Sequence, residues 1–502
     1  MNLLLITLFL IVFSFVANFL PKYKKIFIIV SILFVVSFYF FLEKNFFFKE
    51  SLCPTREIQH YTFCSNYYNL LVDSFRQHKL NIQTENISHD KGIFYIKSRN
   101  DNKDKVLSLL DTSTYKGNLY LYFGITPVLL FYLPFNLITT LYLTDKFLVF
   151  FISCLIFLLS LFTVKFCLKK TTVTNNIPPN IIISSIFLIG FCNLLPFILI
   201  RSTIYEVAVT TAVLLLFISI CLFYYYIYTQ NLKTRYILIL FISTFLCLSV
   251  GARPHYALFI PIFLFFIIFL KYKETTNFKD ILRPAIIFII PCLIYGTIIA
   301  LYNYLRFDSV FEFGFRYQTN HLDLLDYKLT IKDFIIGLKN NFFLLPSIKA
   351  DTFFSLTKAY GHRIGNDFVT GVFWMAPVIL ILFFVPSFFK QIYQKDKKLL
   401  IFLLLFITII FINIIVCCFF GTTIRGIFEF LSLMIILAVI MFLFYINNSD
   451  DKLTKNLFNF LFMLIFSFSL FMNMCLLFSL YQDSAFSSTC MNSYTKIIEF
   501  LF

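Results

Sequence analysis

Long apolar runs, nearly free of charged residues, alternate with short polar connections along this chain. Runs of about 15–23 apolar residues are long enough to cross a ~30 Å hydrocarbon core as helices. Lysines gather in every second connection, and the other connections hold single arginines. Because the lysine and arginine bias of short loops sets the orientation of membrane helices, the lysine-rich connections mark the cytoplasmic side. The pattern therefore predicts a multi-pass membrane protein and the side that its long loops face.

The composition excludes a soluble globular domain. Sixty per cent of the residues are hydrophobic and 14% are charged, and the mean hydropathy is +0.85, whereas soluble domains average about 25% charged residues. The net charge of +16 lies mostly in the lysine-rich connections, so it indicates membrane orientation rather than nucleic-acid binding. We expect one integral membrane domain over 1–502, in the cytoplasmic (inner) membrane of a bacterium. Membrane lipids are its expected surroundings, and the sequence indicates no nucleic acid and no protein partner.

The fold class predicted is an all-α polytopic membrane protein with twelve transmembrane helices. Lys22, Lys24 and Lys25 stand in the first connection, which places the N-terminus on the extracytoplasmic side. The twelve spans are drawn at 3–20, 26–42, 147–168, 181–200, 207–229, 236–250, 257–270, 285–305, 370–389, 399–420, 427–445 and 457–480.

One further apolar run, at 122–143, does not fit the alternation. Its sequence is YFGITPVLLFYLPFNLITTLYL, and counting it as a span would place the later lysines outside. Pro127 and Pro134 also interrupt the hydrogen-bond ladder of a helix. We therefore expect an interfacial or re-entrant helix here, with thirteen spans as the alternative.

Two loops on the predicted extracytoplasmic side are long, at 43–146 and 306–369. Both are polar, mixed in charge and contain tyrosines, and neither is rich in glycine, serine or proline as a flexible linker is. Their pattern favours short helices, such as 67–76, over alternating strands. Nearly all the candidate chemistry of the chain stands in these loops or at the span ends beside them.

Three arginines stand alone at the extracytoplasmic ends of spans, in the stretches RSTIYE, GARPHY and GTTIRGIFEF. A guanidinium group is a permanently charged fork that binds two phosphate oxygens at once. A lipid-linked phosphate lies at this depth, so we predict that the three groups converge on one such headgroup. The alternative is that each arginine snorkels or pairs with a local glutamate. The residues assigned to substrate binding here are Arg201, Glu206, Arg253, His255, Arg425 and Glu429.

Two carboxylates of the first long loop are candidates for catalysis. Sugar transfer to a hydroxyl needs a carboxylate to take the acceptor's proton, often with a divalent metal that holds the leaving phosphate. Asp73 lies on the predicted helix 67–76, and Asp111 precedes a turn at Tyr115-Lys116-Gly117-Asn118. A solvated helix face is the alternative for Asp73, and an Asx turn or helix cap for Asp111. The cofactor expected, if the transfer uses one, is Mg²⁺ or Mn²⁺, with no ligands assigned.

The second long loop opens with FEFGFRYQ. Arg316 and Tyr317 can bond to and stack on a sugar ring, so they are further candidates for substrate binding. The same side chains serve equally well to dock one loop on the other, and both interpretations stay open.

The chain resembles the C-type (GT-C) membrane glycosyltransferases. The resemblance rests on a first outer loop with a YYNLLVDSF helix, a GNLYLYFG segment and a proline-containing re-entrant helix. More narrowly, DTSTYKGNLYLYFG, RSTIYEVAV and GARP are similar to a set of bacterial membrane proteins that carry a D-x-S-Y-Y-N-G-K-Y-Y-L-Y-F-G stretch. The resemblance covers about residues 60–320, and a weaker similarity is found at Arg425–Glu429. The resemblance implies sugar transfer from a polyprenyl-phosphate-linked donor to a lipid, glycan or protein acceptor on the extracytoplasmic face.

The chain departs from that family at one position. The family carries a pair of acidic residues near the start of the first outer loop, whereas Cys64, Ser65 and Asn66 precede the tyrosines here. Either Asp73 or Asp111 has taken the role, or the metal-binding chemistry is lost. Two other classes therefore compete with a transferase: a lipid-linked saccharide flippase or transporter, and an inactive scaffold of the same fold.

Overall fold

The computed structural model describes most of the chain and divides it into two compact units. Unit 1 comprises Met1–Asn45, Ser153–Arg201 and Leu329–Phe502, and unit 2 comprises Phe46–Ile152 and Ser202–Lys328. The residues described are 2–47, 67–82, 87–90, 93–97, 104–107, 112–171, 177–318, 330–349, 353–362, 367–448 and 451–483.

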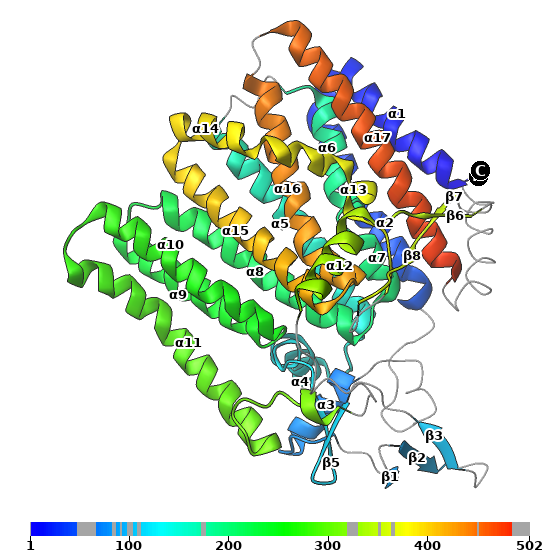
Figure 1. Ribbon diagram of the computed structural model, residues 1–502, viewed down its shortest axis with the longest axis vertical. Helices are drawn as coiled ribbons and strands as arrows, with labels where there is room; N and C mark the ends of the chain where they lie inside the picture. Colours follow the sequence, from blue (N-terminus) through cyan, green and yellow to red (C-terminus); the bar gives the residue numbers. More distant parts are fainter. Residues whose placement is uncertain are drawn as a thin grey trace. The chain divides into compact units, whose positions relative to one another are not determined.

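Helices make up most of the described chain (Figure 1). The helices before residue 230 are α1 (Asn2–Phe19), η1 (Pro21–Tyr23), α2 (Lys24–Phe47), α3 (Tyr67–Arg76), η3 (Val128–Tyr132), α4 (Leu133–Thr139), α5 (Asp145–Thr171), α6 (Pro179–Phe191), α7 (Leu195–Arg201) and α8 (Ile204–Tyr228). Those after it are α9 (Leu232–Val250), η5 (Pro254–Leu258), α10 (Phe259–Glu274), α11 (Phe278–Phe307), η6 (Phe315–Tyr317), α12 (Ile331–Phe343), α13 (Val372–Met375), η7 (Pro377–Phe384), α14 (Val385–Lys395), α15 (Lys397–Phe420), α16 (Ile424–Asn448) and α17 (Lys452–Asp483).

The predicted class, an all-α polytopic membrane protein, is confirmed. Eleven helical stretches of the described residues are long and apolar enough to cross a membrane. Eleven of the twelve predicted spans fall on them, and the remaining one, 3–20, falls on α1, whose 18 residues measure about 27 Å. The largest displacement is at 370–389, where the structure places the span at Pro377–Lys395. Pro377 opens a new helical turn there, because proline fits the first turn of a helix and not its interior.

The run at 122–143 forms a short helical segment, as predicted, and not a span. A π-helical turn, η3, leads directly into α4, which ends at Thr140 with a left-handed backbone. The apolar stretch Val128–Thr139 would measure only about 18 Å, well short of a ~30 Å hydrocarbon core. Pro134, in the first turn of α4, lacks the N–H that a regular ladder needs, and the wider π turn lies just before it.

The two long loops hold short helices, as predicted: α3 has the predicted bounds, and α12 lies in the second loop. The expectation of helices rather than strands is wrong in part. The loops also hold short antiparallel strands. The strands are β1 (Ile87–Asp90), β2 (Ile93–Lys97), β3 (Asp104–Leu107), β4 (Thr112–Tyr115), β5 (Asn118–Leu121), β6 (Ser347–Lys349), β7 (Phe353–Ser355), β8 (Thr357–Lys358) and β9 (Phe368–Val369). Each is only two to five residues long, too short to show a clear alternation of polar and apolar residues.

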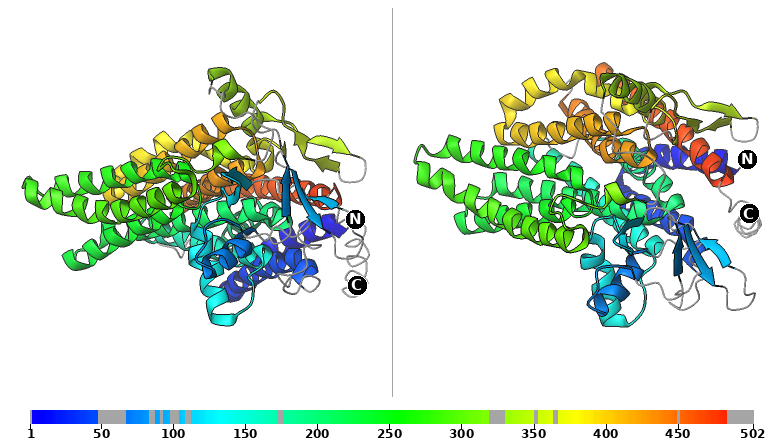
Figure 2. Two further views of the ribbon diagram at one scale, coloured as in Figure 1. Left: turned by 90° about the horizontal axis from the view of Figure 1, so that it is seen from below. Right: turned by 60° about the horizontal axis from the view of Figure 1, so that its bottom comes forward.

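In unit 2, the helices α8, α9, α10 and α11 lie side by side, and Figure 2 shows them as long neighbouring rods in both views. Helix α8 is buried on almost every side, whereas α11 exposes large apolar side chains such as Leu293 and Ile294. An apolar, exposed helix face suits a hydrocarbon environment. Because consecutive helices run in opposite directions, α8 begins, α9 ends and α11 ends at one end of this group, which we call the loop end. We call the opposite end, where α9 and α11 begin, the lysine end.

In unit 1, the buried centre is formed by α6 and α16. The helices α1 and α17 pack against α6, and α15 packs against α16 (Figure 1). Helix α12 lies on the last turn of α15, where Gly337 comes so close to the backbone of Cys418 that a Cβ atom would stand 2.1 Å from its carbonyl oxygen. Helix α12 of the second long loop is thereby fixed to the end of α15.

Candidate functional site

The β4–β5 hairpin organises the loop end of unit 2. Lys116 and Gly117 both have a positive φ, of 48° and 75°, which is the geometry of a two-residue type I′ turn. The turn predicted at Tyr115–Asn118 is therefore confirmed, although its strands were not foreseen. Asp111, a predicted catalytic residue, directly precedes β4 and lies outside the described residues, so its role stays a prediction.

The start of the second long loop docks on this hairpin. The Ser113 hydroxyl donates to the carbonyl oxygen of Gly314 at 2.6 Å, and Gly314 has a left-handed backbone with φ of 93°. The Tyr317 ring lies 4.7 Å from that of Tyr115. The structure thus shows the loop-docking interpretation of Tyr317, while the Arg316 side chain is exposed. A role of either residue in substrate binding stays a prediction.

A buried arginine that the sequence analysis missed holds β5. Arg306, 4% exposed, donates to the carbonyl oxygen of Leu121 at 2.7 Å and to the amide oxygen of Asn303 at 2.8 Å. Its guanidinium also lies 3.8 Å from the centre of the Tyr302 ring, a cation–π geometry. In the sequence it stands at the end of a span, where an arginine is usually explained by snorkelling.

The predicted residue Arg253 is positioned by contact between two glycine-containing segments. The Thr126 N–H donates to the carbonyl oxygen of Gly251 at 3.2 Å, and a Cβ atom on Gly124 would stand only 1.8 Å from that same oxygen. Two backbones can approach this closely only where side chains are absent. Arg253 follows Gly251 by two residues and begins the η5 turn, which also carries His255. Arg253 and His255 are therefore fixed against the segment that leads into η3.

Helix α3 packs against η3 and α4. The Tyr68 and Tyr132 rings are 5.2 Å apart, and the Tyr132 hydroxyl donates to the Asp145 carboxylate. The Asn69 amide fixes the helix further by donating to the carbonyl oxygen of Leu143 at 2.8 Å. Burial raises the pKa of the fully buried Tyr68 phenol well above its ordinary value; Asp145 raises it further, and Arg253 lowers it. Arg253 and Asp145 are therefore close enough to Tyr68 for their charges to act on it.

The predicted catalytic residue Asp73 is half-buried on the same helix. The Tyr142 hydroxyl donates to its Oδ1 atom at 2.7 Å. Burial raises the pKa of the Asp73 carboxyl, and the Tyr142 hydrogen bond and the charge of Arg76 act in the opposite direction. This environment differs from the solvated helix face that was the alternative. A carboxylate that is oriented by one bond and whose pKa is raised is suited to accept a proton.

Glu206 has a structural role at the N-terminus of α8. Its carboxylate accepts from the backbone N–H of Thr203 at 3.1 Å and from the Thr203 hydroxyl, which completes a capping box. The ring of the preceding residue, Tyr205, packs edge-on against the Phe123 ring, and the two ring centres are 5.0 Å apart. A substrate-binding role for Glu206 stays a prediction beside this role.

Unit 1 contains the other two predicted arginines. Arg201 donates to the Asp367 carboxylate at 2.7 Å, and the Asp367 N–H donates to the carbonyl oxygen of Thr422 at 3.1 Å. Thr422 stands three residues before Arg425, in the turn that opens α16. Asp367 thus connects the segments that carry the two arginines, and Glu429, 4% exposed, follows one helical turn later. The sequence analysis missed Asp367, because it is one of several acids in the loop 306–369.

The candidate residues therefore form two groups. Unit 2 holds Asp73, Glu206, Arg253, His255, Arg316 and Tyr317, and unit 1 holds Arg201, Arg425 and Glu429. The convergence of all three arginines on one headgroup stays a prediction.

The structure adds one buried carboxylate to the candidates. Glu43, near the end of the apolar helix α2, is fully buried, and ionisable residues within membrane segments are by default functional candidates. Among the residues described, no three His, Cys, Asp or Glu side chains come together as a metal site. We therefore assign no ligands to the Mg²⁺ or Mn²⁺ that was expected, and no chemical step depends on it below.

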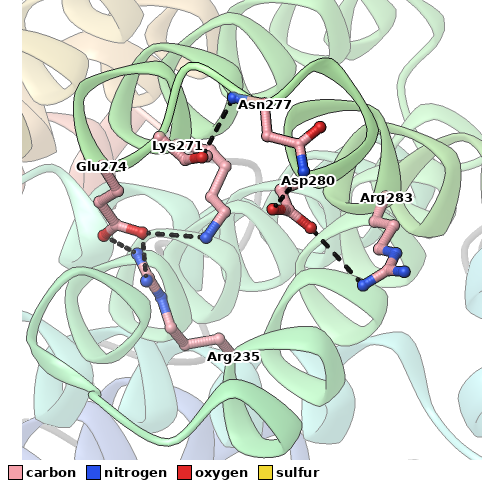
Figure 3. Close-up of polar contacts among 7 residues, drawn as sticks. Arg235, Lys271, Glu274, Asn277, Asp280 and Arg283 are labelled. Carbon is pink, nitrogen blue, oxygen red and sulfur yellow. Dashed lines mark hydrogen bonds and ion pairs between the residues drawn. The ribbon is translucent and has the colours of Figure 1, made fainter.

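The lysine end of unit 2 carries a compact ion network (Figure 3). The two outer nitrogens of Arg235 bind the two carboxylate oxygens of Glu274 at 2.7 and 2.8 Å, and Lys271 reaches the same carboxylate at 3.3 Å. Asp280 accepts from the Asn277 amide and pairs with Arg283 at 3.6 Å. The network ties the start of α9 to the end of α10.

No family model matches the sequence, and no curated protein matches it. Among solved structures, the apo crystal structure of the Archaeoglobus fulgidus oligosaccharyltransferase is similar, with 11% identity and a TM-score of 0.49 over 94% of this chain and 60% of that one. The archaeal oligosaccharyltransferase AglB from the same organism, in complex with an inhibitory peptide and a dolichol-phosphate, has 12% identity and a TM-score of 0.44, over 90% of this chain and 56% of that one. This chain therefore spans about 60% of the length of these proteins. No functional role is assigned to its residues from this similarity.

Proposed function

We propose that this protein transfers a sugar from a polyprenyl-phosphate-linked donor to a lipid, glycan or protein acceptor on the extracytoplasmic face of the membrane. The observation that carries the proposal is the grouping at the loop end of unit 2. Helix α3 carries there a half-buried carboxylate, Asp73, and a buried phenol, Tyr68, which packs on Tyr132 and on which the charge of Arg253 acts. The lysine-rich connections of unit 2 lie at the opposite end of the helices α8–α11. This position favours an extracytoplasmic loop end.

The proposed reaction needs one base and one site for the phosphate. An acceptor hydroxyl oxygen attacks the anomeric carbon of the donor sugar, and the bond from that carbon to the phosphate oxygen breaks. The electron pair leaves with the polyprenyl phosphate, and the hydroxyl proton passes to the Asp73 or Asp111 carboxylate. Arg253 would stabilise the negative charge on the leaving phosphate, a role that Arg201 and Arg425 would share if the two groups of residues converge.

The two alternative functions, a transporter and an inactive scaffold, lead to different expectations for the polar residues. A transporter carries charged or broken positions near the middle of its spans, whereas the candidate residues here stand at helix ends and in the loops. An inactive scaffold would keep the same fold and bind no donor. The lipid-linked saccharide flippase and the scaffold are both tested by the experiment below.

The test uses Asp73→Asn and Asp111→Asn, each in full-length protein reconstituted in lipid vesicles with a radiolabelled polyprenyl-phosphate sugar. We expect one of the two variants to lose transfer by a factor of at least 100, because general-base catalysis contributes about 10²–10⁴-fold. The control is Asp280→Asn, which removes a carboxylate from the lysine end and should leave transfer unchanged. Wild-type rates in both loop variants would exclude these carboxylates from the reaction. Movement of the labelled lipid across the bilayer without transfer would favour the flippase, and neither activity would favour the scaffold.

A further inference from the structure

Tyr68 on α3 carries a buried phenol. The side chain is fully buried on α3, and its hydroxyl has no hydrogen-bond partner among the residues that the structure describes. A buried hydroxyl without a partner is costly, and native proteins rarely leave one without a water, an ion or a functional reason. Two other buried phenols have partners: Tyr39 donates to the carbonyl oxygen of Gly190 at 2.5 Å, and Tyr132 donates to Asp145.

The surroundings of Tyr68 indicate what the hydroxyl would bind. A second buried phenol, Tyr302, also has no partner for its hydroxyl within the described part of the chain, and it lies close enough to act electrostatically on Tyr68. The Asp145 carboxylate accepts a bond from Tyr132, and Arg253 brings a permanent positive charge. The pKa of Tyr68 is raised, so its hydroxyl keeps the proton at physiological pH and acts as a donor. A donor beside a cation, with no acceptor in place, suits an anionic oxygen.

We propose that Tyr68 and Arg253 together bind the phosphate group of a polyprenyl phosphate, with the Tyr68 hydroxyl donating to one phosphate oxygen and the Arg253 guanidinium pairing with the others. Arg253 is only partly buried, so the phosphate meets it first. Tyr68 is fully buried in this conformation, so binding requires side chains around it to change rotamer, as commonly happens at binding sites. The inference rests on the proposed function and adds the residue that recognises the phosphate.

The test measures binding without catalysis, so that it does not depend on transfer. Full-length protein in detergent is titrated with farnesyl phosphate, a short polyprenyl phosphate, and with farnesol, which has the same tail and no phosphate. We expect Tyr68→Phe to weaken farnesyl phosphate binding by about tenfold or more, the loss typical of one charge-assisted hydrogen bond. Farnesol binding should not change. The melting temperature should stay the same or rise, because the variant removes an unsatisfied hydroxyl and keeps the ring.

The matched control is Tyr304→Phe, since Tyr304 is 52% exposed on α11 and should bind farnesyl phosphate as the wild type does. A double-mutant cycle of Tyr68→Phe with Arg253→Gln should be non-additive, because both groups contact one phosphate. Wild-type affinity of Tyr68→Phe, or additivity in the cycle, would overturn the role of Tyr68 and leave the proposed function standing. No binding of farnesyl phosphate by the wild type would overturn both. Equal binding of phosphatidic acid would show a general site for headgroup phosphates and overturn the preference for a polyprenyl carrier.

Discussion

The two ends of unit 2 differ in the contacts of their polar groups, although at the lysine end too one buried atom, Nε of Arg235, has no hydrogen-bond partner among the described residues. At the lysine end, Arg235 is held by both oxygens of Glu274, and its guanidinium lies over the Tyr226 ring at 4.8 Å. At the loop end, two buried phenols, Tyr68 and Tyr302, have no hydrogen-bond partner among the described residues. Arg235 and Tyr302 belong to the same four-helix group, whereas Tyr68 stands on α3, which is packed in the first long loop.

This difference separates a structural polar site from a candidate functional one. A network whose charged groups bind each other directly, as Arg235 and Glu274 do, stabilises the packing of helices. A buried polar group that is left unsatisfied lowers stability, and such groups collect where a ligand or a reaction needs them. The lysine end thus joins helices, and the loop end is where we expect chemistry.

The largest effect is expected where two backbones meet at the loop end. In Gly124→Ala, the new Cβ atom would stand 1.8 Å from the Gly251 carbonyl oxygen and 3.0 Å from the Cα atom of Ala252. Backbone cannot move away as the end of a side chain can, so we expect a loss of more than about 3 kcal/mol in the free energy of unfolding. The measurement is thermal unfolding in detergent.

Gly296→Ala is the control for that variant. Gly296 lies in the interior of α11 with nothing within 4 Å of a new Cβ atom, so alanine should stabilise the helix by about 0.5–1 kcal/mol. Equal stability of the two variants would mean that the segments before η3 and η5 are not in contact. The contact that is inferred to position Arg253 would then be excluded.

The second prediction compares two arginine variants, one of which should lose transfer and the other stability. Arg253→Gln should lower kcat/KM for sugar transfer on the order of 100-fold, about 2.7 kcal/mol, and leave the melting temperature nearly unchanged. Arg235→Gln should do the reverse: it breaks a bidentate pair whose carboxylate is 41% exposed, so we expect a loss of about 1–2 kcal/mol in stability with transfer per folded molecule intact. Loss of stability in Arg253→Gln with normal transfer would remove the distinction between the two ends.

The spans could be predicted from the sequence because hydrophobicity and length decide them. All twelve predicted spans fall on helices, and the short segment Val128–Thr139 was recognised from its prolines and from the lysine alternation. The hairpin was missed for a physical reason. The signal of β4–β5 lies in two turn residues, Lys116 and Gly117, and four-residue strands show too few alternations to be recognised.

The candidate site was predictable only in part. Solitary charges such as Asp73 and Arg253 stand out in an apolar sequence, because a charge in or near a membrane is costly. Their partners do not: nothing in the sequence connects Arg201 with Asp367, which is 166 residues away, or marks Tyr68 among 29 tyrosines. Burial and long-range pairing decide these roles, and both arise only when the chain folds.

The smallest effect concerns the pH dependence of transfer, if Asp73 is the base. Burial holds the pKa of Asp73 above its ordinary value, so the active carboxylate form is lost as the pH falls through that raised pKa. The Tyr142 hydroxyl donates to the carboxylate at 2.7 Å and favours the charged form. Tyr142→Phe removes this bond, so the pKa of Asp73 should rise further. The acid limb of kcat/KM should then move to higher pH.

At high pH the carboxylate is present in both proteins, so the plateau rate of Tyr142→Phe should stay within about twofold of the wild type. The measurement is the profile of kcat/KM against pH for both proteins, with Tyr304→Phe as the control for replacing a tyrosine on an exposed helix face. A shift of the acid limb to lower pH would contradict the assignment, because it would mean that Tyr142 stabilises the protonated form. An unchanged limb would separate Asp73 from the reaction and leave Asp111 as the base to be tested.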